Sequence, residues 1–267
     1  DCNDQNTPNS HLAKNWDSLS SEDKSKSLYR MWTPKAVTDT YEPGSVFKIV
    51  TSAIALEENV VDTDTVNFNC TGAYYVQGES RPIKCHKYPS SHGAESLRLA
   101  LENSCNPAFV ELGLKIGKER SYKYYEALGF FGKTGISLLG EPKNGGIFYD
   151  IDKIKPHELG TMSFGQRFTI TPLQMITAAS AIANDGVLLQ PQIVDHITNT
   201  DTGEVTNFST KEIRQVFSKE TSDKVTSMME SVVELGTGKK VKYDDSVKES
   251  MSGYSIGGKT GTSEPIN

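Results

Sequence analysis

Long apolar runs, basic runs and repeats are all missing from this chain. No stretch of about 18 apolar residues, the length of a membrane-spanning helix, occurs in its 267 residues, and no signal peptide is recognisable. Acidic residues outnumber lysine and arginine by 34 to 28, and the absence of a basic cluster argues against a nucleic-acid-binding protein. An apolar content of 36% without low-complexity tracts argues against disorder and indicates a globular domain.

What the chain does contain is three short motifs in a fixed order. They are Ser45-Val-Phe-Lys48, Ser104-Cys-Asn106 and Lys259-Thr-Gly-Thr262, and together they outline an active-site serine enzyme that acts on an acyl bond. Ser45 follows a Glu-Pro-Gly turn and opens a predicted helix over residues 46–58, so that Lys48 lies one turn beyond it on the same side. Lys48 can act as a base only if its pKa falls, which burial and a second lysine at position 259 would favour.

The other two motifs are predicted to lie on different local structures. Ser104 and Asn106 connect a predicted helix over residues 94–103 with one that begins at Pro107. Lys259 lies in a glycine-rich segment, residues 252–262, which we interpret as a strand whose glycines let a substrate backbone approach. Taken singly, the two serine motifs are also ordinary helix-capping chemistry.

Similar patterns elsewhere in the chain are predicted to be structural. A second S-x-x-K, Ser21 to Lys24, lies in a charged stretch, and the polar residues before Leu28 are expected to form a surface loop. A second K-T-G, Lys133 to Gly135, follows a helix in a loop. The segment from Gly253 to Thr260 satisfies the P-loop pattern, but neither a buried strand before it nor a helix after it is predicted, so a nucleotide site is disfavoured.

With the motifs placed, the chain resembles the transpeptidase domain of class B penicillin-binding proteins, of the cell-division or sporulation type of Gram-positive bacteria. The resemblance rests on these segments: Tyr41 to Lys48, Asn103 to Pro107, Gly165-Gln166, Thr171 to Gln174, Gly236-Thr-Gly238 and Gly257 to Thr262. It implies a peptidoglycan D,D-transpeptidase that forms an acyl-enzyme from D-Ala-D-Ala stem peptides, cross-links them, and is covalently inhibited by β-lactams.

The same resemblance implies a role for each motif residue. Ser45 is the nucleophile, Lys48 takes its proton, and Ser104 passes a proton to the leaving amine, with Asn106 and Lys259 holding the network. The carboxylate-binding segment is Thr260, Gly261 and Thr262, and the backbone N–H groups of Ser45 and Thr262 form the oxyanion hole. No cofactor is required for this chemistry. The resemblance further implies an extracytoplasmic location in bacteria, a membrane anchor before this chain and a partner glycosyltransferase.

Two features of the sequence bear on the choice between related functions. The middle motif reads Ser-Cys-Asn rather than Ser-Asp-Asn, which argues against a class A β-lactamase, yet Glu141 lies roughly where such a hydrolase carries its deacylating glutamate. We interpret Leu138 to Glu141 as a transpeptidase loop instead. A relative that hydrolyses or senses β-lactams, and a non-catalytic scaffold of the same fold, remain the alternatives.

The predicted fold is α+β: an antiparallel sheet flanked by helices, as one domain over residues 1–267. Compared with the family's five-stranded sheet, strands at both ends are expected to be missing. Thr171 to Gln174 is a capping box that begins a helix reaching Asn184, residues 219–235 form another helix, and Asp201-Thr-Gly203 marks a hairpin.

The cysteines allow three interpretations: a metal site, a disulfide or free thiols. Cys70 and Cys85 bracket a predicted hairpin, and His86 and His92 follow closely, so that Cys70, Cys85, His86 and His92 are candidate ligands of a structural zinc ion. A Cys70–Cys85 disulfide suits an extracytoplasmic domain equally well. Cys105 could join either arrangement through space.

Overall fold

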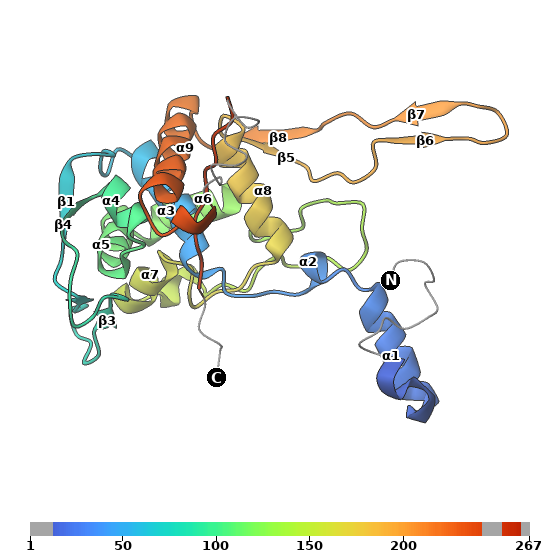
Figure 1. Ribbon diagram of the computed structural model, residues 1–267, viewed down its shortest axis with the longest axis horizontal. Helices are drawn as coiled ribbons and strands as arrows, with labels where there is room; N and C mark the ends of the chain where they lie inside the picture. Colours follow the sequence, from blue (N-terminus) through green and yellow to red (C-terminus); the bar gives the residue numbers. More distant parts are fainter. Residues whose placement is uncertain (1–12, 242–252, 263–267) are drawn as a thin grey trace.

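The computed structural model describes residues 13–241 and 253–262, most of which form a helical body with one long projecting arm (Figure 1). The α-helices are α1 (Ser21–Trp32), α2 (Lys35–Thr38), α3 (Lys48–Glu57), α4 (Leu97–Glu102), α5 (Asn106–Ile116), α6 (Lys118–Ala127), α7 (Pro156–Met162), α8 (Pro172–Ala183) and α9 (Lys219–Glu234). Short 3-10 helices are η1 (Ala13–Ser18), η2 (Gly44–Phe47), η3 (Ile151–Lys153) and η4 (Lys239–Val241). The strands are β1 (Val66–Cys70), β2 (Ala73–Tyr74), β3 (Ile83–Lys84), β4 (Gly93–Ser96), β5 (Val187–Leu189), β6 (His196–Thr198), β7 (Val205–Asn207) and β8 (Glu212–Gln215).

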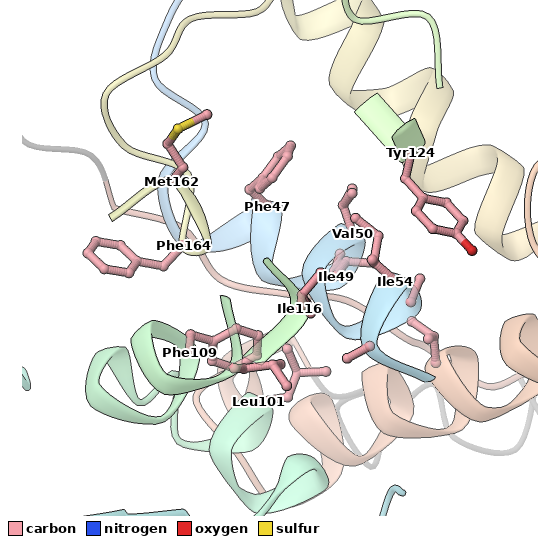
Figure 2. Close-up of a cluster of buried hydrophobic side chains, with 14 of the residues drawn as sticks. Phe47, Ile49, Val50, Ile54, Leu101, Phe109, Ile116, Tyr124, Met162 and Phe164 are labelled. Carbon is pink, nitrogen blue, oxygen red and sulfur yellow. The ribbon is translucent and has the colours of Figure 1, made fainter. Parts of the chain in front are cut away.

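Helix α3 is the centre of the body. Its sequence is apolar on nearly every side, and every residue from Lys48 to Leu56 is buried, as expected for a helix enclosed by others. It packs against α4, α5, α6, α8 and α9. Figure 2 shows Phe47, Val50 and Ile54 of this region among side chains from the surrounding helices. The helix that carries the first motif is therefore held on all sides by the core.

Phe47 anchors the start of this helix in an aromatic cluster. Its ring lies 4.7 Å from that of Phe168, 5.4 Å from Tyr125 and 5.7 Å from Phe130, measured between ring centroids. Burying a phenylalanine of this kind contributes roughly 1.5–3 kcal/mol to stability. This packing fixes the position of the residues on either side of Phe47, which include Ser45 and Lys48.

Strands in the described part of the chain occur only as antiparallel pairs: β1 with β4, β2 with β3, β5 with β8, and β6 with β7. The predicted mixture of helices and antiparallel strands is thus confirmed, while the larger sheet that helices were expected to flank is not formed by these residues. None of the helices within residues 13–241 and 253–262 combines the length and apolar character that crossing a membrane requires.

Several predicted elements are confirmed. Thr171 caps α8, with its Oγ1 accepting from Gln174 N–H at 3.1 Å while Gln174 Oε1 accepts from Thr171 N–H at 3.0 Å. Helix α9 covers nearly all of the predicted residues 219–235. The hairpin around Gly203 is β6–β7, and it forms the tip of the arm in Figure 1. Residues 192–215 of this arm are all exposed.

Three predictions were wrong. Residues 94–96 belong to β4 rather than to a helix, because Glu95 and its neighbours pair with β1, and α4 begins only after Ser96, whose Oγ accepts from Leu99 N–H. The polar stretch before Leu28 includes η1 and most of α1 instead of a loop. The segment of Lys259 is not a strand in its described part, because Gly258 N–H donates to Met229 O of α9 at 3.1 Å rather than to another strand.

Candidate active site

Ser45 lies in η2, immediately before the buried helix α3. The residue is half-buried. Gly44 N–H, one residue earlier, donates to Gly165 O at 2.8 Å. Gly165 has a φ of 85°, and a Cβ built there would overlap the carbonyl oxygen of Gly44. The loop that follows α7 therefore fixes the backbone of Gly44, immediately before Ser45, and only glycine fits at position 165 of that loop.

Lys48 points from α3 into the second motif. Its Nζ donates to Ser104 O at 2.7 Å, to Ser104 Oγ at 3.1 Å and to Asn106 Oδ1 at 2.8 Å. The side chain is fully buried, with the rings of Phe109 and Phe164 at 5.2 and 5.8 Å from Nζ. Burial, and after it the neighbouring ammonium of Lys259, holds the pKa of Lys48 well below its ordinary value. The neutral form of Lys48, which can accept a proton, is therefore favoured more than in an exposed lysine.

Ser104 occupies a strained position between two helices. Its φ of 52° is in the left-handed region, which costs a non-glycine residue roughly 1–3 kcal/mol. Helix α4 ends two residues before it and α5 begins two residues after it. This sharp connection turns both the carbonyl oxygen and the hydroxyl of Ser104 toward Lys48, while Cys105 points into the core.

Lys259 reaches the same hydroxyl from the opposite direction. Its Nζ donates to Ser104 Oγ at 2.9 Å and to Thr260 O at 2.8 Å. Burial lowers the pKa of Lys259 to about 8. Thr260, Gly261 and Thr262 follow at the exposed surface. An apolar cavity of about 450 Å³ lies beside this segment and is lined by Val46, Met175 and Met229, among others.

The two lysines leave the Ser104 hydroxyl in a defined state. A hydroxyl has two acceptor lone pairs and one proton to donate. Because Lys48 and Lys259 both donate to Oγ, the lone pairs are engaged and the proton is directed elsewhere. The structure thus brings four of the predicted site residues together: Lys48 contacts Ser104 and Asn106, and Lys259 contacts Ser104. A larger cavity of about 830 Å³ lies at the base of the arm and contains none of these residues.

The rival motifs lie apart from this site and have structural roles. The second S-x-x-K, Ser21 to Lys24, forms the first turn of α1, and the preceding residue Ser20 caps this helix, with its Oγ accepting from Asp23 N–H at 3.1 Å. In the second K-T-G, Glu141 Oε1 accepts from Thr134 N–H at 2.7 Å and from Thr134 Oγ1 at 2.6 Å, while its other oxygen accepts from Gly135 N–H. Glu141, the candidate deacylating glutamate, therefore braces a loop.

A cluster of sulfur and nitrogen ligands lies behind the second motif. The potential ligand atoms of Cys70, Cys85, His92 and Cys105 are all within 4.8 Å of one another. His86, predicted to take part, is not a member because it is exposed on the turn after Cys85, and Cys105 replaces it. The alternative disulfide is not formed, since Cys70, Cys85 and Cys105 are free thiols. Burial raises the pKa of both Cys85 and Cys105.

Comparison with known proteins identifies the family of this chain. Residues 4–267 match the family model of the penicillin-binding protein transpeptidase domain. Stage V sporulation protein D of Bacillus subtilis is 39% identical over 234 residues, which cover 86% of this chain and 34% of that protein. The D,D-transpeptidase domain of a peptidoglycan glycosyltransferase from Eggerthella lenta is 30% identical with a TM-score of 0.76, covering 88% of this chain and 57% of that one.

A third relative was solved with an antibiotic. Penicillin-binding protein 3 of Mycobacterium tuberculosis complexed with ampicillin is 27% identical with a TM-score of 0.71, covering 85% of this chain and 49% of that one. The chain thus spans between a third and about three-fifths of the length of these relatives. Because the family model covers nearly the whole sequence, the chain belongs to the penicillin-binding protein transpeptidase domain family.

Proposed function

We propose that this chain is the catalytic part of a serine D,D-transpeptidase that cross-links peptidoglycan stem peptides ending in D-Ala-D-Ala. The observation that carries the proposal is the convergence of Lys48 and Lys259 on the hydroxyl of Ser104. Lys48 and Lys259 are 211 positions apart in the sequence, and their meeting on one hydroxyl supports a shared role in proton transfer. The relatives named as D,D-transpeptidases, at 28–30% identity, support the same activity.

In the proposed reaction, Ser45 Oγ attacks the carbonyl carbon between the two D-alanines and gives its proton to neutral Lys48. The new ester bond forms as the C–N bond breaks, and Ser104 delivers a proton to the departing D-alanine amine. Lys48 then returns its proton through Ser104. An amine of a second stem peptide takes the acyl group in a second step of the same kind, which regenerates Ser45.

The remaining motif residues are assigned by position. Asn106 accepts from Lys48 at 2.8 Å and so holds the base in place. Thr260, Gly261 and Thr262 extend from Lys259 along the surface and would bind the terminal carboxylate of the substrate. The N–H groups of Ser45 and Thr262 would form the oxyanion hole, where one donor is typically worth about 3–4 kcal/mol.

The test is an intact mass spectrum of the protein after incubation with a penicillin. A stable adduct is expected on the native protein and on Ser209→Ala, a control in the exposed arm, but not on Ser45→Ala. Incubation with a pentapeptide ending in D-Ala-D-Ala should release D-alanine. No adduct on the correctly folded native protein would contradict the proposal and favour a non-catalytic scaffold.

A β-lactam hydrolase is the alternative, and the structure offers it little support. Hydrolysis needs a base that activates water against the acyl-enzyme, and both carboxylate oxygens of Glu141 accept from Thr134 and Gly135 instead. A penicillin adduct that forms and disappears within minutes would favour the hydrolase. An adduct that persists for hours favours the transpeptidase.

We also propose that Cys70, Cys85, Cys105 and His92 hold a structural zinc ion. Three thiols and one imidazole are a typical structural zinc set, and their mutual separation suits four ligands at about 2.0–2.3 Å from one ion. Within the described residues, buried Nε2 of His92 and Oε2 of Glu95 have no hydrogen-bond partner, which marks this as a polar site that the protein atoms leave unsatisfied. The ion would hold β1 and the β2–β3 hairpin to the start of α5.

Metal analysis of the purified protein tests this proposal. About one zinc per chain is expected, with loss of the metal and a lower melting temperature in Cys70→Ser. His86→Ala should keep the metal, because His86 lies outside the cluster. A metal-free native protein in which peptide mapping finds Cys70 joined to Cys85 would contradict the zinc proposal and establish the disulfide.

The family membership also bears on the location of the protein. Because the substrate, peptidoglycan, lies outside the bacterial cytoplasm, we infer that this chain acts on the extracytoplasmic side. A membrane anchor and a glycosyltransferase that supplies glycan strands would complete the system. Accessibility of the protein to an externally added protease in intact protoplasts tests the location, and complete protection would contradict it.

A further inference from the structure

Two residues outside the three motifs connect the second motif to the third. Glu102 is the last residue of α4, two positions before Ser104, and Thr237 follows the C-terminus of α9. The backbone N–H of Thr237 donates to Glu102 O at 3.0 Å. Gly236, the residue before Thr237, lies so close to the end of α4 that a Cβ atom at position 236 would be 2.6 Å from Glu102 O. The turn after α9 is therefore pressed against the end of α4.

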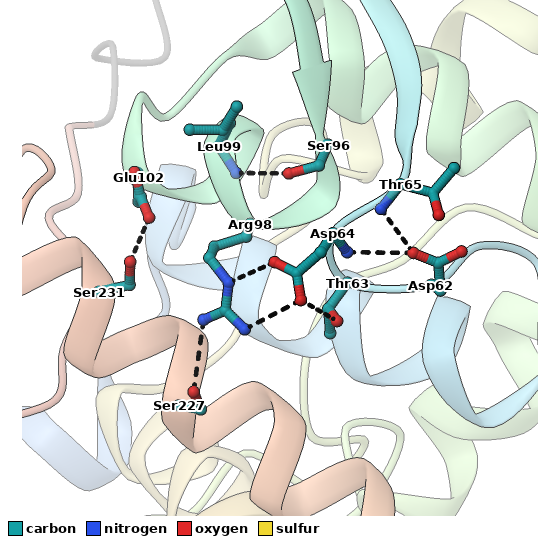
Figure 3. A network of polar contacts seen from close by, with 10 residues as sticks. All are labelled: Asp62, Thr63, Asp64, Thr65, Ser96, Arg98, Leu99, Glu102, Ser227 and Ser231. Atoms are coloured by element: carbon teal, nitrogen blue, oxygen red, sulfur yellow. Dashed lines mark hydrogen bonds and ion pairs between the residues drawn. The ribbon is translucent and has the colours of Figure 1, made fainter.

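Side chains reinforce this contact along one face of α4. Arg98 Nη1 donates to Ser227 Oγ at 3.3 Å, and Ser231 Oγ donates to the carboxylate of Glu102. Figure 3 shows both pairs. Arg98 and Glu102 are one helical turn apart on α4, and their partners Ser227 and Ser231 are one helical turn apart on α9. Because residues four apart share a helix face, the two polar pairs hold α4 and α9 in one register. Glu102 is buried, so its hydrogen bond to Ser231 is shielded from water.

The third motif is attached to α9 and its turn at two points. Gly258 N–H donates to Met229 O, as described above. Beyond Lys259, the hydroxyl oxygens of Thr237 and Thr260 are 2.8 Å apart. Lys259 lies between these two attachments, and its Nζ reaches Ser104, which α4 holds from the other side.

From this arrangement we infer that Thr237 and Glu102 are positioning residues, which together set the distance between the Lys259 ammonium and the Ser104 hydroxyl. Glu102 fixes the end of α4, and hence Ser104, against α9. Thr237 fixes Thr260, and hence Lys259, against the same helix. The inference rests on the proposed function, because the distance matters only if Ser104 and Lys259 carry protons or hold substrate.

If the contact between Thr237 and Thr260 is lost, the effect on acylation depends on whether Lys259 stays buried. If its segment moves outward, Lys259 becomes hydrated and its charge no longer opposes protonation of Lys48. The other titratable groups near Lys48 are Glu95 of β4, Cys85, His86 and His92 of the segment between β3 and β4, and Cys105 before α5, and none of them belongs to the Lys259 segment. Acylation of Ser45 would then need a higher pH than in the native protein.

The experiment compares Thr237→Val, which keeps the size of the side chain but removes its hydroxyl, with Thr237→Ser, which restores one. Thr206→Val in the exposed strand β7 is the matched control. Thr237→Val should lower the rate constant of acylation by a penicillin about fivefold, the effect of one hydrogen bond, and move its pH profile to higher pH. Thr237→Ser and Thr206→Val should stay within about twofold of native, the scatter of a neutral surface change.

A second measurement does not depend on activity. Hydrogen exchange of the amides in residues 254–262 should be faster in Thr237→Val and also in Ser231→Ala, which loosens the Glu102 side of the same contact. If the native protein is acylated but Thr237→Val matches it in rate, pH profile and exchange, the inference is wrong. If the native protein is not acylated, the proposed function fails, and faster exchange would still establish the positioning contact.

Discussion

At the scale of single residues, the site depends on two lysines that lie close together in a dry place. Lys48 is buried and surrounded by the rings of Phe109 and Phe164, so its neutral form is favoured. The ammonium of Lys259 opposes protonation of Lys48 further, although burial is the larger cause. Ser104 joins the two, because its hydroxyl accepts from both.

This coupling predicts a shift in pH dependence when Lys259 is neutralised. In Lys259→Met the pKa of Lys48 should rise, because one of the two causes that lower it is removed. A base acts in its unprotonated form, so the acylation rate increases as the pH rises through that pKa, and a higher pKa moves the increase to higher pH. The measurement is the rate constant for penicillin acylation between pH 5 and 10.

Lys133→Met is the control for this prediction, since it removes an exposed lysine from the second K-T-G. Its pH profile should match that of the native protein. A profile for Lys259→Met that keeps the native midpoint, with only a lower plateau, would show that the charge of Lys259 does not act on Lys48.

At the scale of elements, Ser45, the proposed nucleophile, is positioned by a contact between two loops as well as by the helix that follows it. Gly165, in the loop after α7, lies directly against Gly44 at the start of η2. Arg167, two residues after Gly165, donates its backbone N–H to Glu42 Oε1 at 2.8 Å. These contacts tie the residues just before Ser45 to a segment more than 100 positions away in the sequence.

Gly165→Ala tests the importance of this contact. Alanine would be strained at a φ of 85° and would overlap the Gly44 carbonyl, so we expect a loss of about 2–4 kcal/mol in the free energy of unfolding. Acylation should also slow, because the backbone shift that relieves the overlap with Gly44 would displace the adjacent Ser45. Gly203→Ala, at a φ of 73° with open space around it, is the control and should cost only about 1–2 kcal/mol. Urea unfolding provides the comparison, and equal losses in the two variants would contradict the prediction.

At the scale of the whole molecule, the body and the arm are distinct in their packing. The core surrounds α3, whereas residues 192–215 are exposed throughout and β6 pairs only with β7. A two-stranded hairpin without an apolar face against other elements contributes little to the stability of a domain.

We therefore expect that the arm can be shortened without loss of the site. Replacing residues 194–208 with a short glycine-containing turn should change the melting temperature by no more than about 2 °C, as expected for a surface change of under 0.5 kcal/mol. The penicillin acylation rate should remain native. Thermal unfolding and intact mass spectrometry measure the two effects, and a large fall in either would mean that the arm supports the body.

Much of the site was predictable because its chemistry is local to three motifs. The spacing from Ser45 to Lys48, the turn from Asn103 to Pro107 and the Lys259 segment were all recognised, and the structure brings Lys48, Ser104, Asn106 and Lys259 together. The capping box at Thr171 was equally clear, because both of its hydrogen bonds lie within four residues. Local signals of this kind do not depend on the rest of the fold.

The errors arose where distant partners override local preference. Glu95 reads as helix-forming, but it pairs with Phe68 of β1, and the segment of Lys259 bonds to α9 where a strand was expected. Cys105 replaces His86 in the sulfur cluster because the end of α4 and the start of α5 turn it inward. No sequence motif indicated a role for Glu102. For Thr237 the only indication was the Gly236-Thr-Gly238 segment of the family resemblance.

By itself, the sequence determined the identity and order of the reactive groups, the helices that carry them and the family to which the chain belongs. Only the tertiary structure decided which groups meet: two lysines 211 positions apart on one hydroxyl, and three thiols with one histidine in one place. The physical reason is that motif chemistry is encoded over a few neighbouring residues. Burial, pKa shifts and ligand convergence depend on contacts that form only when α3, α4, α5 and α9 pack together.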